Sequence, residues 1–72
     1  MKNVEIDGFR VTFEHNEELP GVFFPNGRLI NIATNEEGAR LSIGRHFNNI
    51  VDADNAVIQL ARSRINSNTW RN

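Results

Sequence analysis

The two histidines of this 72-residue chain are its best candidates for acid–base chemistry, and neither has the companions that catalysis requires. A nucleophilic hydroxyl needs a neighbouring base, which a third group must orient. Ser42 and His46 are four residues apart on or after one expected strand, but no GxSxG turn is present to activate the hydroxyl. We therefore expect a protein that is not an enzyme.

The segment 14–18 gathers side chains that can bind metals, namely Glu14, His15, Glu17 and Glu18. Zinc sites use Cys or His pairs at fixed spacings, and calcium loops need a glycine and a terminal bidentate glutamate. Neither pattern occurs here, and there is no GxxxxGKS or GxGxxG loop to hold a phosphate. The sequence predicts a solvated acidic loop, with no metal and no cofactor.

Length and composition indicate one small domain. A domain of this size buries only ~60% of its unfolded surface, and no cysteine is present to add a disulfide. A homodimer therefore stays open as a source of additional stability. The lack of cysteine fits a reducing compartment, the first residues lack the apolar run of a signal peptide, and no apolar stretch could cross a bilayer. We expect a cytoplasmic protein with no membrane contact.

The elements that must position any binding residue begin with a hairpin over residues 3–13. Asp7-Gly8 supplies the two positive-φ positions of a two-residue turn, and apolar residues alternate on both sides of it. The expected register pairs Ile6 with Phe9, Glu5 with Arg10 and Val4 with Val11. All the apolar side chains then share one face of the hairpin.

The next strands are expected from further turn signals. Residues 15–21 (HNEELPG) are polar and indicate a surface loop, and Asn26-Gly27 predicts a second hairpin turn. Pro25 cannot donate a ladder hydrogen bond, so the strand before it should lie at an edge or end there. A third turn over 35–38 leads into the last strand. We expect the helix to be faced by the side chains of Ile30, Ile32, Leu41 and Ile43.

A helix begins after Asp52, which we expect to be its N-cap, and arginines fill its last turns. Its apolar stripe consists of Ala53, Ala56, Val57, Leu60, Ala61 and Ile65. The predicted fold is therefore α+β: an antiparallel β-meander of three to five strands packed against one C-terminal α-helix. Residues 1–66 form this domain, and residues 67–72 are expected to be a flexible C-terminal tail.

Charge is divided unequally along the chain. Residues 1–38 carry three basic and seven acidic side chains, a net of −4, whereas residues 39–72 carry five and two, a net of +3. Arginine outnumbers lysine seven to one, which favours the use of positive groups in planar, bidentate contacts. Two interpretations of the basic half stay open, a binding patch or an ordinary polar surface, and Trp70 is either an interface anchor or part of the core. The candidate partner-binding residues are Arg40, Arg45, His46, Arg62, Trp70 and Arg71.

From about Leu19 to Ile65 the order of these signals resembles the small three-stranded-sheet-plus-helix DNA-binding domains of the plant ethylene-response-factor class and of phage integrase arm-binding domains. The matching features are Gly21-Val22, the alternating strand 29–33 (LINIA), Ile43-Gly44 followed by Phe47, and the alanine-rich helix 52–61. The resemblance implies that the sheet face opposite the helix reads bases in the major groove with arginine and tryptophan. On the expected strands, Arg40 is the single cation of that face.

DNA affinity depends chiefly on neutralised phosphates, and a pI near 6.0 opposes it. We therefore expect a small non-catalytic binding protein that docks on a larger protein, of the accessory or inhibitor kind that phages and mobile elements encode. The alternative is a sheet-reading DNA-binding module.

Overall fold

The first hairpin forms around a turn in which both central residues have positive φ, 49° at Asp7 and 85° at Gly8. In the computed structural model, which describes residues 2–71, this turn joins β1 (Asn3–Ile6) to β2 (Phe9–Phe13). The register pairs Val4 with Val11, Glu5 with Arg10 and Ile6 with Phe9, which confirms the predicted pairing.

The second hairpin differs from the prediction. Its turn lies at Pro20-Gly21, where Gly21 has φ 78°, and a Pro-Gly pair of this kind suits a two-residue turn because proline fixes a negative φ and glycine accepts a positive one. The expected loop 15–21 instead contains β3 (Asn16–Leu19), which pairs with β4 (Val22–Phe24). The expected turn at Asn26-Gly27 is also wrong, since both residues belong to β5 (Asn26–Asn31).

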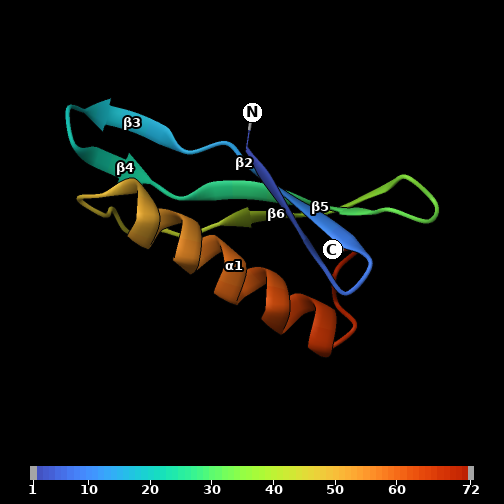
Figure 1. Cartoon of the computed structure of the whole chain (residues 1–72). Helices are drawn as coiled ribbons and strands as arrows, with labels where there is room; N and C mark the ends of the chain where they lie inside the picture. The colour runs from blue at the N-terminus through green and yellow to red at the C-terminus, as the bar shows by residue number, and fades with distance from the viewer. Residues whose placement is uncertain (1, 72) are drawn as a thin grey trace.

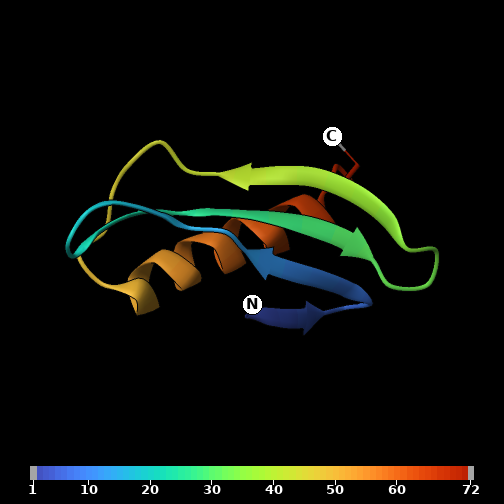
Figure 2. The same cartoon turned by 90° about the horizontal axis from the view of Figure 1, so that it is seen from above.

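One face of a four-stranded antiparallel sheet is covered by the helix, as Figures 1 and 2 show. The strand order is β1-β2-β5-β6, with β6 spanning Glu36–Ser42, and β3 and β4 form a separate two-stranded sheet. The helix, α1, spans Ile50–Asn66. Six antiparallel strands and one C-terminal helix make this an α+β fold, as predicted. No helix among the described residues is long and apolar enough to pass through a membrane.

The helix starts earlier than predicted because Asn49, and not Asp52, is its N-cap. The Asn49 Oδ1 accepts a hydrogen bond from the Asp52 backbone N–H at 2.8 Å, and its Nδ2 donates to the Asp52 carboxylate at 2.9 Å. This pair resembles a capping box, in which the N-cap and N3 residues bond to each other, except that the Asp52 carboxylate accepts from the side chain of Asn49 and not from its backbone N–H. Asp52 is therefore the acidic residue of the first turn.

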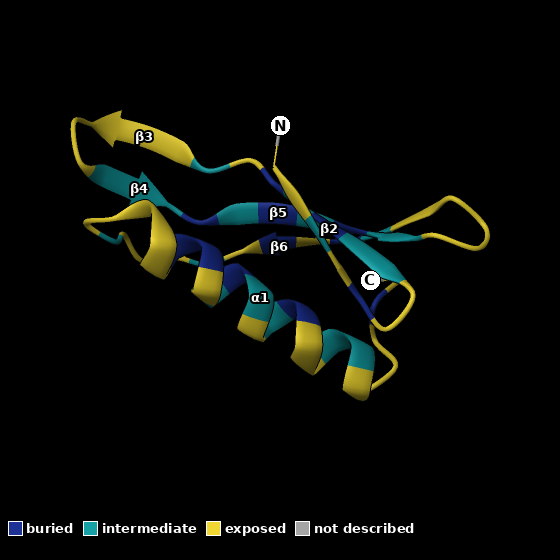
Figure 3. Cartoon of the chain, viewed as in Figure 1, coloured by how far each residue is buried: buried dark blue, intermediate teal, exposed yellow. Residues whose placement is uncertain are grey.

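The core lies between the sheet and the helix, where the buried residues line both elements (Figure 3). Its fully buried members include Val11, Leu29, Leu41 and Val57. Trp70 belongs to the same cluster and is only 5% exposed. Its ring meets Phe9 edge to face at 4.9 Å, and its carbonyl accepts the Ala39 N–H at 2.6 Å.

These contacts correct the prediction of a flexible tail over 67–72. The described part of that segment packs on the sheet, while position 72 lies outside the described residues. The physical reason is that a small sheet and one alanine-rich helix leave core volume unfilled, and a tryptophan ring fills it.

Candidate binding surface

The contact between Gly27 and the helix shows which face of the sheet is covered and which is open. A Cβ on Gly27 would lie 3.0 Å from the Cγ1 of Val57, so this position of β5 faces the helix. Because side chains alternate along a strand, Leu29 faces the same way, and Arg28 and Ile30 point to the opposite side. Leu29 is fully buried, and Ile30 is half-buried.

This arrangement corrects the expected orientation of β5. Ile30 and Ile32 were predicted to face the helix, yet Ile30 lies on the open face and Ile32 is 37% exposed in the turn after the strand. Leu41 and Ile43 do lie on the core side as predicted. The run Leu29–Ile32 contains three apolar residues and therefore supports either alternation, and the close approach of Gly27 to the helix decides between them.

The open face carries two rows of side chains that cross the strands. One row joins Asn3, Thr12, Arg28 and Arg40 as successive cross-strand partners. The other joins Glu5, Arg10, Ile30 and Glu37 in the same way. We call the set of these eight residues the open face. Ser42, at the end of β6, extends it beyond Arg40.

The open face is mixed in charge, with three arginines and two glutamates for a net of +1. Glu37 accepts a hydrogen bond from the Nη1 of Arg28 at 2.6 Å. Glu5 lies opposite Arg10 in the register. Each acidic side chain is thus placed beside one arginine, and Arg40 is the arginine without such a neighbour.

The predicted partner-binding residues do not form one patch. Arg40 is exposed on the open face, and Arg62 is exposed on the outer side of α1. Arg45 stacks over the Phe47 ring at 4.6 Å, and the ring of His46 lies 6.1 Å from that of Phe24. These two line a shallow hollow at the start of the helix, together with Phe47, Asn48, Asn49 and Asp52.

The remaining two predicted residues have structural contacts at the C-terminal end. Trp70 is buried in the core, so of its two interpretations the core one holds. The guanidinium of Arg71 lies 4.4 Å above the Trp70 ring, and its Nε donates to Glu36 at 3.0 Å. The ion pair with Glu36 links the chain end to β6.

The sequence analysis did not place Arg10 and Arg28 together with Arg40 on the open face. For Arg10 the signal was present, because the register of the first hairpin already placed it on the face away from Ile6 and Phe9. The position of Arg28 on this face was not predicted, because Asn26-Gly27 was taken as a turn and Arg28 was therefore not assigned to a face of the strand.

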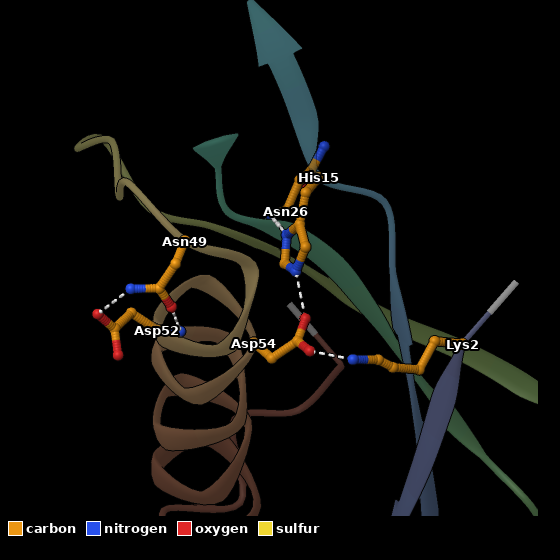
Figure 4. A network of polar contacts seen from close by, with 6 residues as sticks. All are labelled: Lys2, His15, Asn26, Asn49, Asp52 and Asp54. Atoms are coloured by element: carbon orange, nitrogen blue, oxygen red, sulfur yellow. Dashed lines mark hydrogen bonds and ion pairs between the residues drawn. The ribbon is translucent and has the colours of Figure 1, made fainter. Parts of the chain in front are cut away.

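A partly buried polar network links Lys2, His15 and Asn26 to the helix (Figure 4). The His15 Nδ1 accepts the Asn26 backbone N–H at 3.1 Å, so its Nε2 carries the proton and donates to Asp54 at 2.6 Å. Lys2 donates to the other oxygen of the same carboxylate. Burial raises the pKa of Asp54, but the hydrogen bonds from Lys2 and His15 and the positive charge of Lys2 outweigh burial and hold this pKa below the ordinary aspartate value.

This network is structural in character. Both ring nitrogens of His15 are engaged within the protein, and its side chain is 5% exposed, so neither nitrogen faces a substrate. Ser42 and His46 share no hydrogen bond in the part of the chain that is described. Over residues 2–71, no group of three His, Asp or Glu side chains comes together in a way that could hold a metal ion.

Comparison with known proteins adds no relative to this picture: no family model, no curated protein and no solved structure matches the chain.

Proposed function

We propose that this protein is a non-catalytic binding protein that docks on a larger protein through the open face of its four-stranded sheet. The observation that carries the proposal is the composition of that face, in which half-buried Ile30 is surrounded by positively charged arginines and negatively charged glutamates. Protein interfaces characteristically combine an apolar centre with a polar rim in which arginine is enriched. Docking by this face would suit an accessory or inhibitor that covers part of its partner.

Mixed charge also favours a protein over a nucleic acid. Affinity for duplex DNA depends on the number of phosphates that cations neutralise. On the open face, Glu5 and Glu37 lie beside two of the three arginines and would oppose phosphates brought close to them. A protein surface can present both signs of charge and can complement both.

Capture with matched variants tests this proposal. The immobilised protein is exposed to a lysate of its source cells at physiological salt, and retained proteins are identified by mass spectrometry. Ile30→Glu places a charge at the centre of the open face and should abolish retention. Ile32→Glu places the same charge in the adjacent turn, where the side chain is already 37% exposed, and should retain the partner. Equal retention by both variants would show that the partner binds elsewhere.

Sheet-mediated DNA binding is the second candidate, and one observation favours it. Arg10, Arg28 and Arg40 all lie on the open face, whereas the sequence had led us to expect Arg40 alone. Three phosphate contacts would give a log–log salt slope of about −2.7. Fluorescence anisotropy with a labelled duplex at rising salt measures this slope. Sub-micromolar, salt-sensitive binding that Arg40→Ala abolishes would replace the protein-docking proposal with this one.

A further inference from the structure

Arg28 and Arg40 are directly opposite each other in the ladder between β5 and β6. Both side chains lie on the open face, because Gly27 and Leu41, which also pair with each other, face the core. Like charges at directly opposed positions of a sheet are destabilising. The fold therefore retains an unfavourable pair on the sheet face that the helix does not cover.

The protein compensates only half of this pair. The guanidinium of Arg28 bonds to Glu37, but no other side chain within residues 2–71 forms an ion pair or hydrogen bond with that of Arg40. The Glu37 side chain is 66% exposed, so its ion pair with Arg28 is of the weak surface kind that a competing anion can replace. One guanidinium is thus without a counter-charge, and its neighbour holds an exchangeable one.

The surroundings of the pair suit an anion with two oxygens. Guanidinium groups present paired N–H donors in a plane, which match a carboxylate or a phosphate. Two hydroxyl side chains flank the pair on the same face, Thr12 opposite Arg28 and Ser42 two residues beyond Arg40. Sites that conflict with the local rules of stability are typically those that serve a function.

We infer that a carboxylate side chain of the partner protein, an Asp or Glu in an acidic segment, docks between Arg28 and Arg40. This inference rests on the proposed docking by the open face and names the group that this face recognises. A carboxylate fits better than the phosphates of a duplex because the net charge of the open face is only +1, which one or two carboxylates neutralise. A phosphate backbone presents a long series of charges that Glu5 and Glu37 would repel.

A stability measurement tests the unfavourable pair without any partner. Arg40→Thr removes the like charge and adds a residue with high β propensity, so its urea unfolding midpoint should rise above that of the unmodified protein. Arg10→Thr is the matched control, since Arg10 lies opposite Glu5 and its loss removes an opposite-charge neighbour. An Arg40→Thr midpoint that does not exceed that of Arg10→Thr would overturn the inference.

A binding measurement tests the ligand chemistry. Hexaglutamate is titrated into the isotope-labelled protein, and the side-chain Nε–H resonances of the arginines are followed by NMR. The expected result is a saturable shift at Arg28 and Arg40 that Arg40→Thr weakens at least tenfold and that hexalysine does not produce. A short DNA duplex that moves the same resonances with tighter affinity than hexaglutamate would identify phosphate as the ligand and overturn the inference. Absence of any shift with hexaglutamate would also overturn it.

Partner capture separates failure of this inference from failure of the proposed function. Loss of the partner with Ile30→Glu together with full retention by Arg40→Thr would leave docking by the open face in place and refute the carboxylate site. Loss with both variants, and retention with the Ile32→Glu control, supports the two statements together.

Discussion

The Nε2 of His15 lies 2.6 Å from a carboxylate oxygen of Asp54, and this contact ties the segment between β2 and β3 to the first turns of α1. Lys2 binds the second oxygen of the same carboxylate. Lys2 and His15, both far from Asp54 in the sequence, therefore converge on one buried acid.

Removal of that acid should destabilise the fold. Asp54→Ala leaves the buried His15 N–H without an acceptor, and a buried polar group without a partner costs about 1–3 kcal/mol. We expect a loss of that size in the free energy of unfolding from urea denaturation. Asn55→Ala, at the next and exposed helix position, is the control and should change stability by less than about 0.5 kcal/mol. Similar losses in both variants would show that the network contributes nothing specific.

The same carboxylate should make stability depend on pH in the acid range. Its pKa is lowered in the folded protein, so its contribution is complete above the ordinary aspartate pKa and is lost as the pH falls through the lowered value. The stability difference between the unmodified protein and Asp54→Asn should therefore shrink as the pH falls from about 5 to about 2. Urea unfolding at several pH values measures it. A difference that stays constant over this range would contradict the role of the Asp54 charge.

Gly27 should tolerate no larger residue, because of packing and not because of backbone conformation. A Cβ there would collide with the Thr12 carbonyl oxygen and press on Val57. Gly27→Ala should lower the free energy of unfolding by about 1–3 kcal/mol. Gly44→Ala is the matched control, since a Cβ at Gly44 would meet nothing within 4 Å, and it should be close to neutral.

Gly8 should resist substitution for the opposite reason. A Cβ at this glycine meets no atom within 4 Å, but its φ of 85° is strained for any side chain. Gly8→Val should therefore destabilise the first hairpin, because a β-branched residue rarely adopts positive φ. An unchanged chemical denaturation curve would argue against this turn.

Trp70 should behave as a core residue in solution. Its emission should be blue-shifted in the folded protein, and Trp70→Ala should cost about 3–5 kcal/mol, the range for truncating a buried aromatic residue. A chain that ends at Asn66 should lose a similar amount, since it also lacks the Trp70 carbonyl that binds Ala39. An emission typical of a water-exposed indole would refute this placement.

Local signals were sufficient where every part of the signal lay close together in the sequence. The first hairpin needed only Asp7-Gly8 and the alternation beside it, and the existence of the helix needed only its apolar stripe, although its start was predicted too late in the chain. The fold class followed from these elements and their order.

The remaining features depend on contacts between distant segments. Asn26-Gly27 has the sequence of a turn, but both residues lie in strand β5. A glycine is needed at position 27 because the strand passes too close to Val57 of the helix for a larger side chain. Trp70 is buried because Gly38, on β6, leaves room for its ring, and neither residue reveals the other in the sequence. The arginines of the open face could be assigned to one surface only after the register of β5 was known.

The position of Trp70 also bears on how the chain folds during its synthesis. Its ring packs in a core whose other residues all precede it in the sequence, and its carbonyl accepts the backbone N–H of Ala39 in β6. A nascent chain cannot make these contacts until Trp70 has left the ribosome. The hairpins and helix emerge earlier, with the apolar face of the sheet incompletely covered, and such exposed surface is what chaperones bind and what drives aggregation. Ribosome-bound chains stalled before and after Trp70 emerges should therefore differ in protease resistance, with native protection in the longer one.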